Sequence, residues 1–216
     1  PTTTWDVGTG SGVLALSLKS NSPNTEVFAS DVSSGALAIA KRNAKKLNIP
    51  GVRFIKGSLL SPTVKKHLRT SKQKQLLIVA NLPYLPKDDK KKMHKQVTKY
   101  EPNSALFADD HGSSLIKQLL NQVATGLPYL RVPISILLEL DPPQSQPLQR
   151  FAQSLFPYAE IKPFVDFNQK SRFIEITADL PPLQKNKDVE QTNKTGIPVR
   201  ERPERDWREV ERHFQQ

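Results

Sequence analysis

The chain has 216 residues, a formal net charge of +11 and no cysteine. This length suits one domain of moderate size with an appendage, and the lack of cysteine excludes disulfides and thiolate metal sites. No apolar run approaches the roughly 20 residues of a membrane span, and no signal-peptide pattern opens the sequence, so we expect a cytoplasmic protein.

Strand-like apolar runs alternate with amphipathic helical segments as far as about residue 140. The expected strands are residues 3–7, 26–31, 52–56, 76–81 and 134–140, and the expected helices are residues 13–19, 34–47 and 113–124. Ser33 or Ser34 is a suitable N-cap for the second helix. This alternation predicts βαβ units, and therefore an α/β fold with a mostly parallel sheet covered by helices on both faces.

The pattern changes after residue 140. Pro142 and Pro143 predict a turn, residues 146–156 a helix, and residues 159–164 and 172–177 two further strands. Seven residues cannot hold a crossover helix, so these last strands should form an antiparallel hairpin at one edge of the sheet.

We assign residues 1–180 to one domain. Residues 181–216 are polar and without apolar periodicity, which predicts a charged, disordered tail, with a short helix expected at 205–214. A strand begins almost at Pro1, so we expect the chain to be a piece of a longer protein.

A glycine loop follows the first strand and opens the first helix. The motif reads Asp6, Val7, Gly8, Thr9, Gly10, Ser11 and Gly12, and residues 8–12 form the loop itself. Glycine lets a ligand approach the backbone, and the N–H groups at the start of a helix can receive a carboxylate or a phosphate. Asp31 ends the second strand, where a carboxylate can bind the hydroxyls of a ribose. We interpret the loop as a cofactor site; the alternative is an ordinary turn with a helix-capping aspartate.

A second motif, Asn81-Leu82-Pro83-Tyr84, follows the fourth strand. The Asn81 Oδ1 atom and the carbonyl of Leu82 could each accept one proton of a planar NH2 group, and the Tyr84 ring could cover that group. Pro83 stiffens the turn. Taken alone, the tetrapeptide favours an ordinary turn that ends a strand.

Together the glycine loop, Asp31 and the Asn-Leu-Pro-Tyr motif resemble the class I S-adenosylmethionine-dependent methyltransferases. The sequences Tyr-Glu-Pro-Asn-Ser-Ala-Leu-Phe at residues 100–107 and Asp-Asp-His-Gly at residues 109–112 resemble a block of the bacterial HemK/PrmC family. The resemblance runs from about residue 3 to residue 178. It implies a Rossmann-like sheet of seven strands and transfer of a methyl group to the glutamine amide in the Gly-Gly-Gln loop of peptide chain release factors.

The resemblance also implies roles for individual residues. Gly8 to Gly12 would take the methionine end of S-adenosylmethionine, Asp31 its ribose, and Ser58 and Leu59 would lie near the adenine. Asp6 and Asn81 would also be among the cofactor-binding residues. The catalytic and substrate-binding residues would be Asn81, Leu82, Pro83 and Tyr84, and no metal is implied. The departures from the family pattern are Ser58 where many relatives have an acid, Leu82 where proline is usual, and the lack of a helical N-terminal domain and a Pro-Glu-Thr segment before the first strand.

Three other functions compete with this interpretation. Asn-Leu-Pro-Tyr is also similar to the motif of ribosomal RNA adenine dimethyltransferases, and the basic runs at residues 41–46, 65–74 and 87–99 would suit an RNA partner. Those runs contain no interleaved aromatic residues, so solvated surface is the simpler interpretation. A non-catalytic binding module is the second competitor. A dehydrogenase is the third, and the Gly-x-Gly-x-Gly spacing disfavours it.

Overall fold

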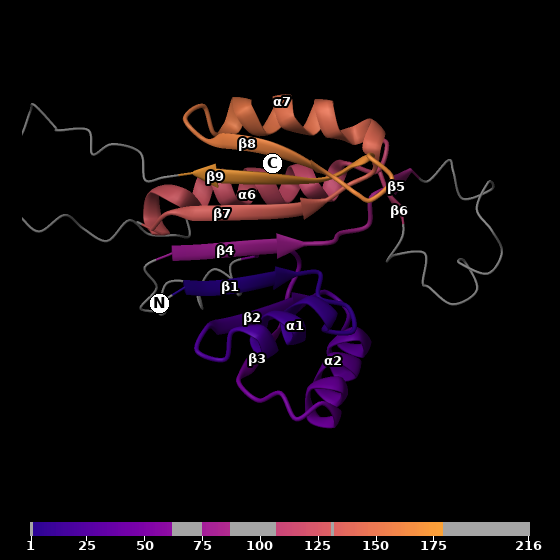
Figure 1. Ribbon diagram of the computed structural model, residues 1–216, viewed down its shortest axis with the longest axis vertical. Coiled ribbons are helices and arrows are strands. Elements are labelled where there is room, and N and C mark those ends of the chain that lie inside the picture. Colours follow the sequence, from indigo (N-terminus) through magenta and orange to yellow (C-terminus); the bar gives the residue numbers. More distant parts are fainter. Residues whose placement is uncertain (1, 62–74, 87–106, 131, 179–216) are drawn as a thin grey trace, which may run out of the picture. The chain divides into compact units, whose positions relative to one another are not determined.

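The computed structural model describes residues 2–61, 75–86, 107–130 and 132–178. A seven-stranded sheet in the order β3-β2-β1-β4-β7-β9-β8 forms its centre (Figure 1). The strands are β1 Thr2–Val7, β2 Glu26–Asp31, β3 Val52–Lys56, β4 Gln75–Ala80, β7 Ile134–Glu139, β8 Glu160–Val165 and β9 Ser171–Ala178. Strands β3, β2, β1, β4 and β7 run parallel, whereas β9 is antiparallel to both β7 and β8. The predicted parallel sheet with a C-terminal antiparallel hairpin is confirmed.

Helices cover both faces of the sheet. They are α1 Val13–Asn21, α2 Ser34–Lys46, α6 Ser114–Leu130 and α7 Ser145–Leu155. Side chains alternate between the faces of a strand, and β2 shows this directly. Val27 packs with Ala15 of α1 in a small cluster, whereas Phe28 belongs to the main core with Leu119 of α6. Each face of the sheet therefore has its own apolar layer.

Local sequence accounts for the start of α2. The Ser33 Oγ atom accepts a hydrogen bond from the Ala36 N–H at 3.2 Å, which satisfies one of the free donors of the first turn. Of the two N-caps proposed from sequence, Ser33 is the one used.

Four elements, α6, η2, β5 and β6, differ from the sequence-based expectation. Helix α6 continues to Leu130, although Gly126 and Pro128 favour an end near residue 124. A 3-10 helix, η2 Pro142–Gln144, occupies the predicted turn, and α7 follows it directly. The short strands β5 Leu85–Pro86 and β6 Phe107–Ala108 pair in parallel. Two-residue strands carry no periodic signal, so sequence gives no basis for them.

Within the described residues, none of the helices combines the length and the apolar character that crossing a membrane requires.

Candidate functional site

The carboxyl ends of β1, β2 and β4 lie along one edge of the sheet (Figure 1). Strand β1 stands between β2 and β4, and Val7, its last residue, pairs with Ser30 on one side and Ala80 on the other. The chain leaves β1 toward β2 but leaves β4 toward β7, so the strand order reverses here. In open α/β sheets a ligand binds in the crevice at such a reversal. The glycine loop (residues 8–12) and the Asn81 loop (residues 81–84) meet at this point.

Backbone hydrogen bonds to β2 hold the glycine loop. The N–H groups of Gly8 and Thr9 both donate to the carbonyl of Ser30, at 2.8 and 2.9 Å. Gly8, Gly10 and Gly12 have φ angles of +75°, +55° and +87°, a region that L side chains rarely adopt. The position that a Gly10 Cβ would occupy has no heavy atom within 4 Å. The loop thus presents accessible backbone at the site.

Asp6 lies behind this loop and is almost fully buried. Its Oδ2 atom accepts hydrogen bonds from the Thr9 hydroxyl at 2.6 Å and from the Ala15 N–H at 3.0 Å. Burial raises the pKa of Asp6 to about 6, and the nearby charge of Asp31 adds to the effect. Asp6 therefore joins the glycine loop to helix α1. Direct contact of Asp6 with a cofactor stays a prediction.

Asp31 lies beside the glycine loop at the end of β2. Its Oδ2 atom accepts the Gly10 N–H at 2.9 Å and its Oδ1 atom accepts the Ser33 N–H at 2.8 Å. Each carboxylate oxygen has a second lone pair, so both atoms can still accept a hydrogen bond from a ligand hydroxyl. The backbone fixes the orientation of the carboxylate and leaves it this capacity.

The turn after β3 lies next to Asp31. The Gly57 N–H donates to the Asp31 carbonyl at 3.0 Å, which brings Ser58 and Leu59 to the same edge of the sheet. Ser58 is exposed, whereas Leu59 is buried and has a φ of +46°. Ser58 and Leu59 are therefore close to Asp31, the residue predicted to bind the ribose. The assignment of Ser58 and Leu59 to the adenine requires this closeness but stays a prediction.

The Asn81 loop contacts the glycine loop through Leu82. The Leu82 side chain is 4% exposed, and its Cδ2 atom lies 2.8 Å from the place that a Gly8 Cβ would occupy. Asn81, by contrast, is exposed. Leucine at position 82 thus fills the core beneath the site, while the neighbouring amide remains free to meet a partner.

Tyr84 is oriented toward the sheet. Its hydroxyl donates to the Glu139 Oε1 atom at 3.2 Å, and its ring packs against the main core. Burial raises the pKa of Tyr84, and the Glu139 carboxylate raises it further. The predicted role of its ring as a cover for a bound NH2 group stays a prediction.

Gln144 also contacts the Asn81 loop, and sequence analysis did not predict it. Its Nε2 atom donates to the Tyr84 carbonyl at 2.7 Å. The two residues are 60 positions apart in the chain, and Gln144 follows a proline pair that predicts only a turn. No local pattern could have revealed this contact.

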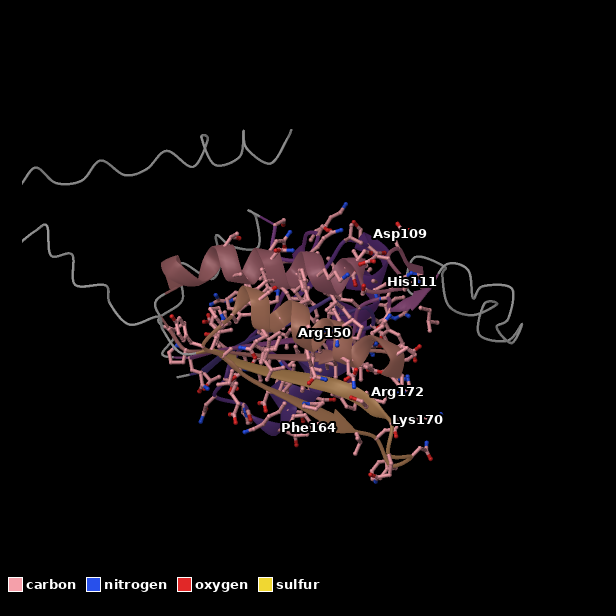
Figure 2. The ribbon with its side chains drawn as sticks, turned by 90° about the horizontal axis from the view of Figure 1, so that it is seen from above. Asp109, His111, Arg150, Phe164, Lys170 and Arg172 are labelled. Atoms are coloured by element: carbon pink, nitrogen blue, oxygen red, sulfur yellow. The ribbon has the colours of Figure 1, made fainter. Side chains whose placement is uncertain are left out.

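Part of the predicted family block lies outside the described residues. This concerns residues 100–106, as well as the basic runs at 65–74 and 87–99 and the tail at 181–216. Residues 109–113 are described and form the turn before α6, where the Asp110 carboxylate accepts hydrogen bonds from Ser113 and Lys117. These bonds, chiefly the one from Lys117, lower the pKa of Asp110. Asp109 and His111 lie on this turn, away from Lys170 and Arg172 of the hairpin (Figure 2).

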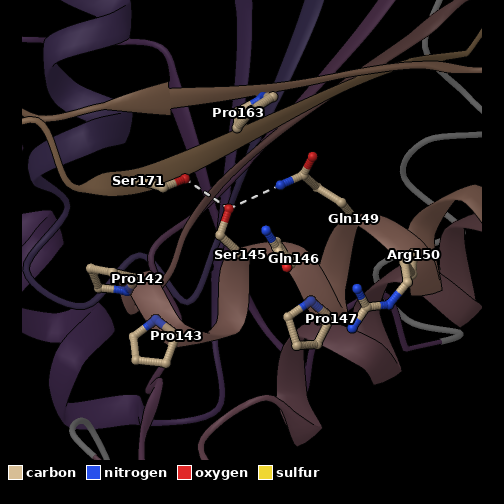
Figure 3. Close-up of a pocket in the computed structure, with 9 residues that line it drawn as sticks. All are labelled: Pro142, Pro143, Ser145, Gln146, Pro147, Gln149, Arg150, Pro163 and Ser171. Carbon is tan, nitrogen blue, oxygen red and sulfur yellow. Dashed lines mark hydrogen bonds between the residues drawn. The ribbon is translucent and has the colours of Figure 1, made fainter.

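A surface groove of about 600 Å³ lies elsewhere, between α7 and the β8–β9 hairpin (Figure 3). It is lined by Pro142, Pro143, Ser145, Gln146, Pro147, Gln149, Arg150, Pro163 and Ser171. None of these residues belongs to the glycine loop or the Asn81 loop. Among the described residues, no group of three His, Cys, Asp or Glu side chains could hold a metal ion.

Sequence comparison agrees with the geometry of the site. Residues 5–100 match a family described as a methyltransferase domain. A release factor glutamine methyltransferase of Enterococcus faecalis is 35% identical over 172 residues, which are 80% of this chain and 58% of that protein. Over this length the chain is similar to the HemK/PrmC family. A second HemK/PrmC relative, the release factor glutamine methyltransferase of Flavobacterium psychrophilum, is 42% identical over 120 residues, 56% of this chain and 40% of that protein.

The fold has counterparts among solved structures. The N-terminal domain of human METTL16, solved in complex with SAH, superposes with a TM-score of 0.53 at 14% identity, covering 81% of this chain and 60% of that one. At such identity the likeness concerns the fold alone. The chain spans 58% of the length of the E. faecalis HemK/PrmC relative.

Proposed function

We propose that this chain is the catalytic domain of a methyltransferase that transfers a methyl group from S-adenosylmethionine to a glutamine side-chain amide of peptide chain release factors. The observation that carries the proposal is the meeting of three features at the strand-order reversal: an open glycine loop, an oriented Asp31 carboxylate and an exposed Asn81 amide. The names of the HemK/PrmC relatives support the choice of substrate.

The residues of the site suit the cofactor. Open space over Gly10 lets a ligand approach the backbone, and the Asp31 oxygens keep lone pairs for the hydroxyls of a ribose. We assign the methionine end to the glycine loop, the ribose to Asp31 and the adenine to the Ser58-Leu59 turn. Bound S-adenosylmethionine supplies an electrophilic methyl group on a sulfonium.

The Asn81 loop would hold the accepting nitrogen. An amide nitrogen is a poor nucleophile because its lone pair is delocalised into the carbonyl. The Asn81 Oδ1 atom and the Leu82 carbonyl would accept its two protons, which directs the nitrogen and stabilises positive charge as it develops. The proton leaves after transfer, so this scheme needs no strong base before attack.

Adenine methylation in RNA is the alternative, and it rests on Leu82 in the Asn-Leu-Pro-Tyr motif. The packing of Leu82 against Gly8 supports a different reason for leucine at this position, because the side chain fills apolar space in the core. We therefore favour a protein substrate. We also propose a cytoplasmic setting and no membrane partner.

The test is a methyl-transfer assay with tritium-labelled cofactor. We expect label to enter a release factor, and not a release factor whose Gly-Gly-Gln glutamine is replaced by alanine. Asn81→Ala should lower kcat by about 100- to 1,000-fold, the range for loss of one group that stabilises developing charge. It should leave thermal stability unchanged, because Asn81 is exposed. Label appearing only in ribosomal RNA would contradict the proposal.

A further inference from the structure

The Asn81 loop is fixed at both ends, although Asn81 itself is exposed. Ala80 at its start belongs to β4, where it pairs with Val7 and Leu138. At its end, the Tyr84 carbonyl accepts a hydrogen bond from Gln144 Nε2 at 2.7 Å. Only three residues separate these points, and one of them is Pro83, whose φ is restricted. The position of the Asn81 amide therefore depends on where Tyr84 is held.

Both ends of the Gln144 carboxamide form hydrogen bonds, and only one of these bonds goes to Tyr84. Its Nε2 atom donates a second hydrogen bond to the His111 carbonyl at 2.8 Å, and its Oε1 atom accepts the Asp141 N–H at 3.0 Å. The side chain is 7% exposed. One buried amide thus joins the Asn81 loop, the turn before α6 and the start of η2.

Gly112 makes room for this arrangement. A Cβ atom at this position would lie 1.8 Å from the Tyr84 carbonyl oxygen and 2.6 Å from Gln144 Nε2, and the φ of Gly112 is +84°. The turn before α6 can therefore approach Tyr84 and Gln144 this closely only with glycine at position 112.

We propose that Gln144 is a positioning residue for methyl transfer, whose carboxamide sets the place of the Asn81 amide through the Tyr84 carbonyl. The inference rests on the proposed function. A displacement of about 1 Å at a reacting centre can cost on the order of 100-fold in rate. Gln144 touches backbone atoms of the loop, and its described contacts include none with the glycine loop, so its loss should affect kcat and spare cofactor binding.

The variants are Gln144→Ala and Gln144→Glu, with Gln149→Ala as the matched control. Gln149 lies on the following helix and donates to the Ser145 hydroxyl at 3.0 Å. We expect Gln144→Ala to lower kcat by about 10- to 100-fold without changing the dissociation constant of S-adenosylhomocysteine, measured by calorimetry. Gln149→Ala should change neither quantity.

Gln144→Glu adds a pH signature. Only the protonated carboxyl can donate to the Tyr84 carbonyl, so the activity of this variant relative to wild type should rise as the pH is lowered. A fold-wide defect would instead lower cofactor binding and kcat together, with no recovery at low pH, and that result would overturn the inference.

Hydrogen exchange separates this inference from the proposed function. Gln144→Ala should speed amide exchange in a peptide covering residues 81–85 and leave a peptide covering residues 8–12 unchanged. If wild type methylates release factor, then Gln144→Ala with unchanged kcat, or with unchanged exchange at residues 81–85, would overturn the role of Gln144. If wild type does not methylate release factor but Gln144→Ala still speeds exchange at residues 81–85, the result would support the positioning of the loop and overturn the proposed substrate.

Discussion

The two loops at the site are held in different ways. The glycine loop is held by residues close to it in sequence or on the neighbouring strand, namely Ser30, Asp31 and Asp6. The Asn81 loop is held by Glu139 and Gln144, more than fifty residues away. The glycine loop therefore has a readable signature, whereas the shape of the Asn81 loop depends on elements that only the folded chain brings together.

The largest effect is expected from a substitution that disturbs the distant contacts of the Asn81 loop. Gly112→Ala places a Cβ against the Tyr84 carbonyl and strains a positive φ; overpacking and backbone strain together should lower the free energy of unfolding by about 4 kcal/mol. Denaturant unfolding measures this loss. The matched control is Gly126→Ala in α6, where the Cβ position is open and alanine should stabilise the helix by about 1 kcal/mol. Equal effects of the two substitutions would contradict the proposed anchor.

Asp6, which holds the glycine loop, should have an effect of intermediate size on stability. Its pKa in the folded chain is about 6, above the ordinary value of 3.8. The folded state therefore holds more protons between these values, and the contribution of Asp6 to stability falls as the pH rises from about 4 to 6, by on the order of 3 kcal/mol.

The variant Asp6→Asn should lack this component and be more stable than wild type at pH 7. Its side-chain oxygen can still accept from Thr9 and Ala15, because both donate to one oxygen in the wild type. Denaturant titrations of both proteins at pH 4, 5, 6 and 7 measure the difference. A constant gap between them across this range would show that Asp6 is not the titrating group.

The smallest effect concerns the contact between the two loops. Gly8→Ala would bring a Cβ to 2.8 Å from Leu82 Cδ2, and Leu82→Ala would remove that atom. The cost of Gly8→Ala should therefore be smaller in the Leu82→Ala background, with a coupling energy of about 1 kcal/mol in a double-mutant cycle of unfolding free energies. Additive effects would mean that the loops fold independently.

The same division between local and distant contacts explains which elements could be predicted from the sequence. Strands β2 and β3 and the N-cap Ser33 agree with expectation because periodicity and capping are local properties. Strands β5 and β6 were not predicted, because two-residue strands exist only through pairing with a distant partner. The end of α6 was misplaced, because Gly126 and Pro128 are signals that the folded chain overrides.

The sequence by itself determined the class of fold, the glycine loop and the identity of the residues that end β1 and β2. These follow from apolar periodicity and from glycines that adopt positive φ. The tertiary structure decided how the residues are oriented: Asp6 behind the loop, Leu82 in the core against Gly8, and Tyr84 held by Glu139 and Gln144. Such contacts join segments far apart in the chain, and no local pattern encodes them.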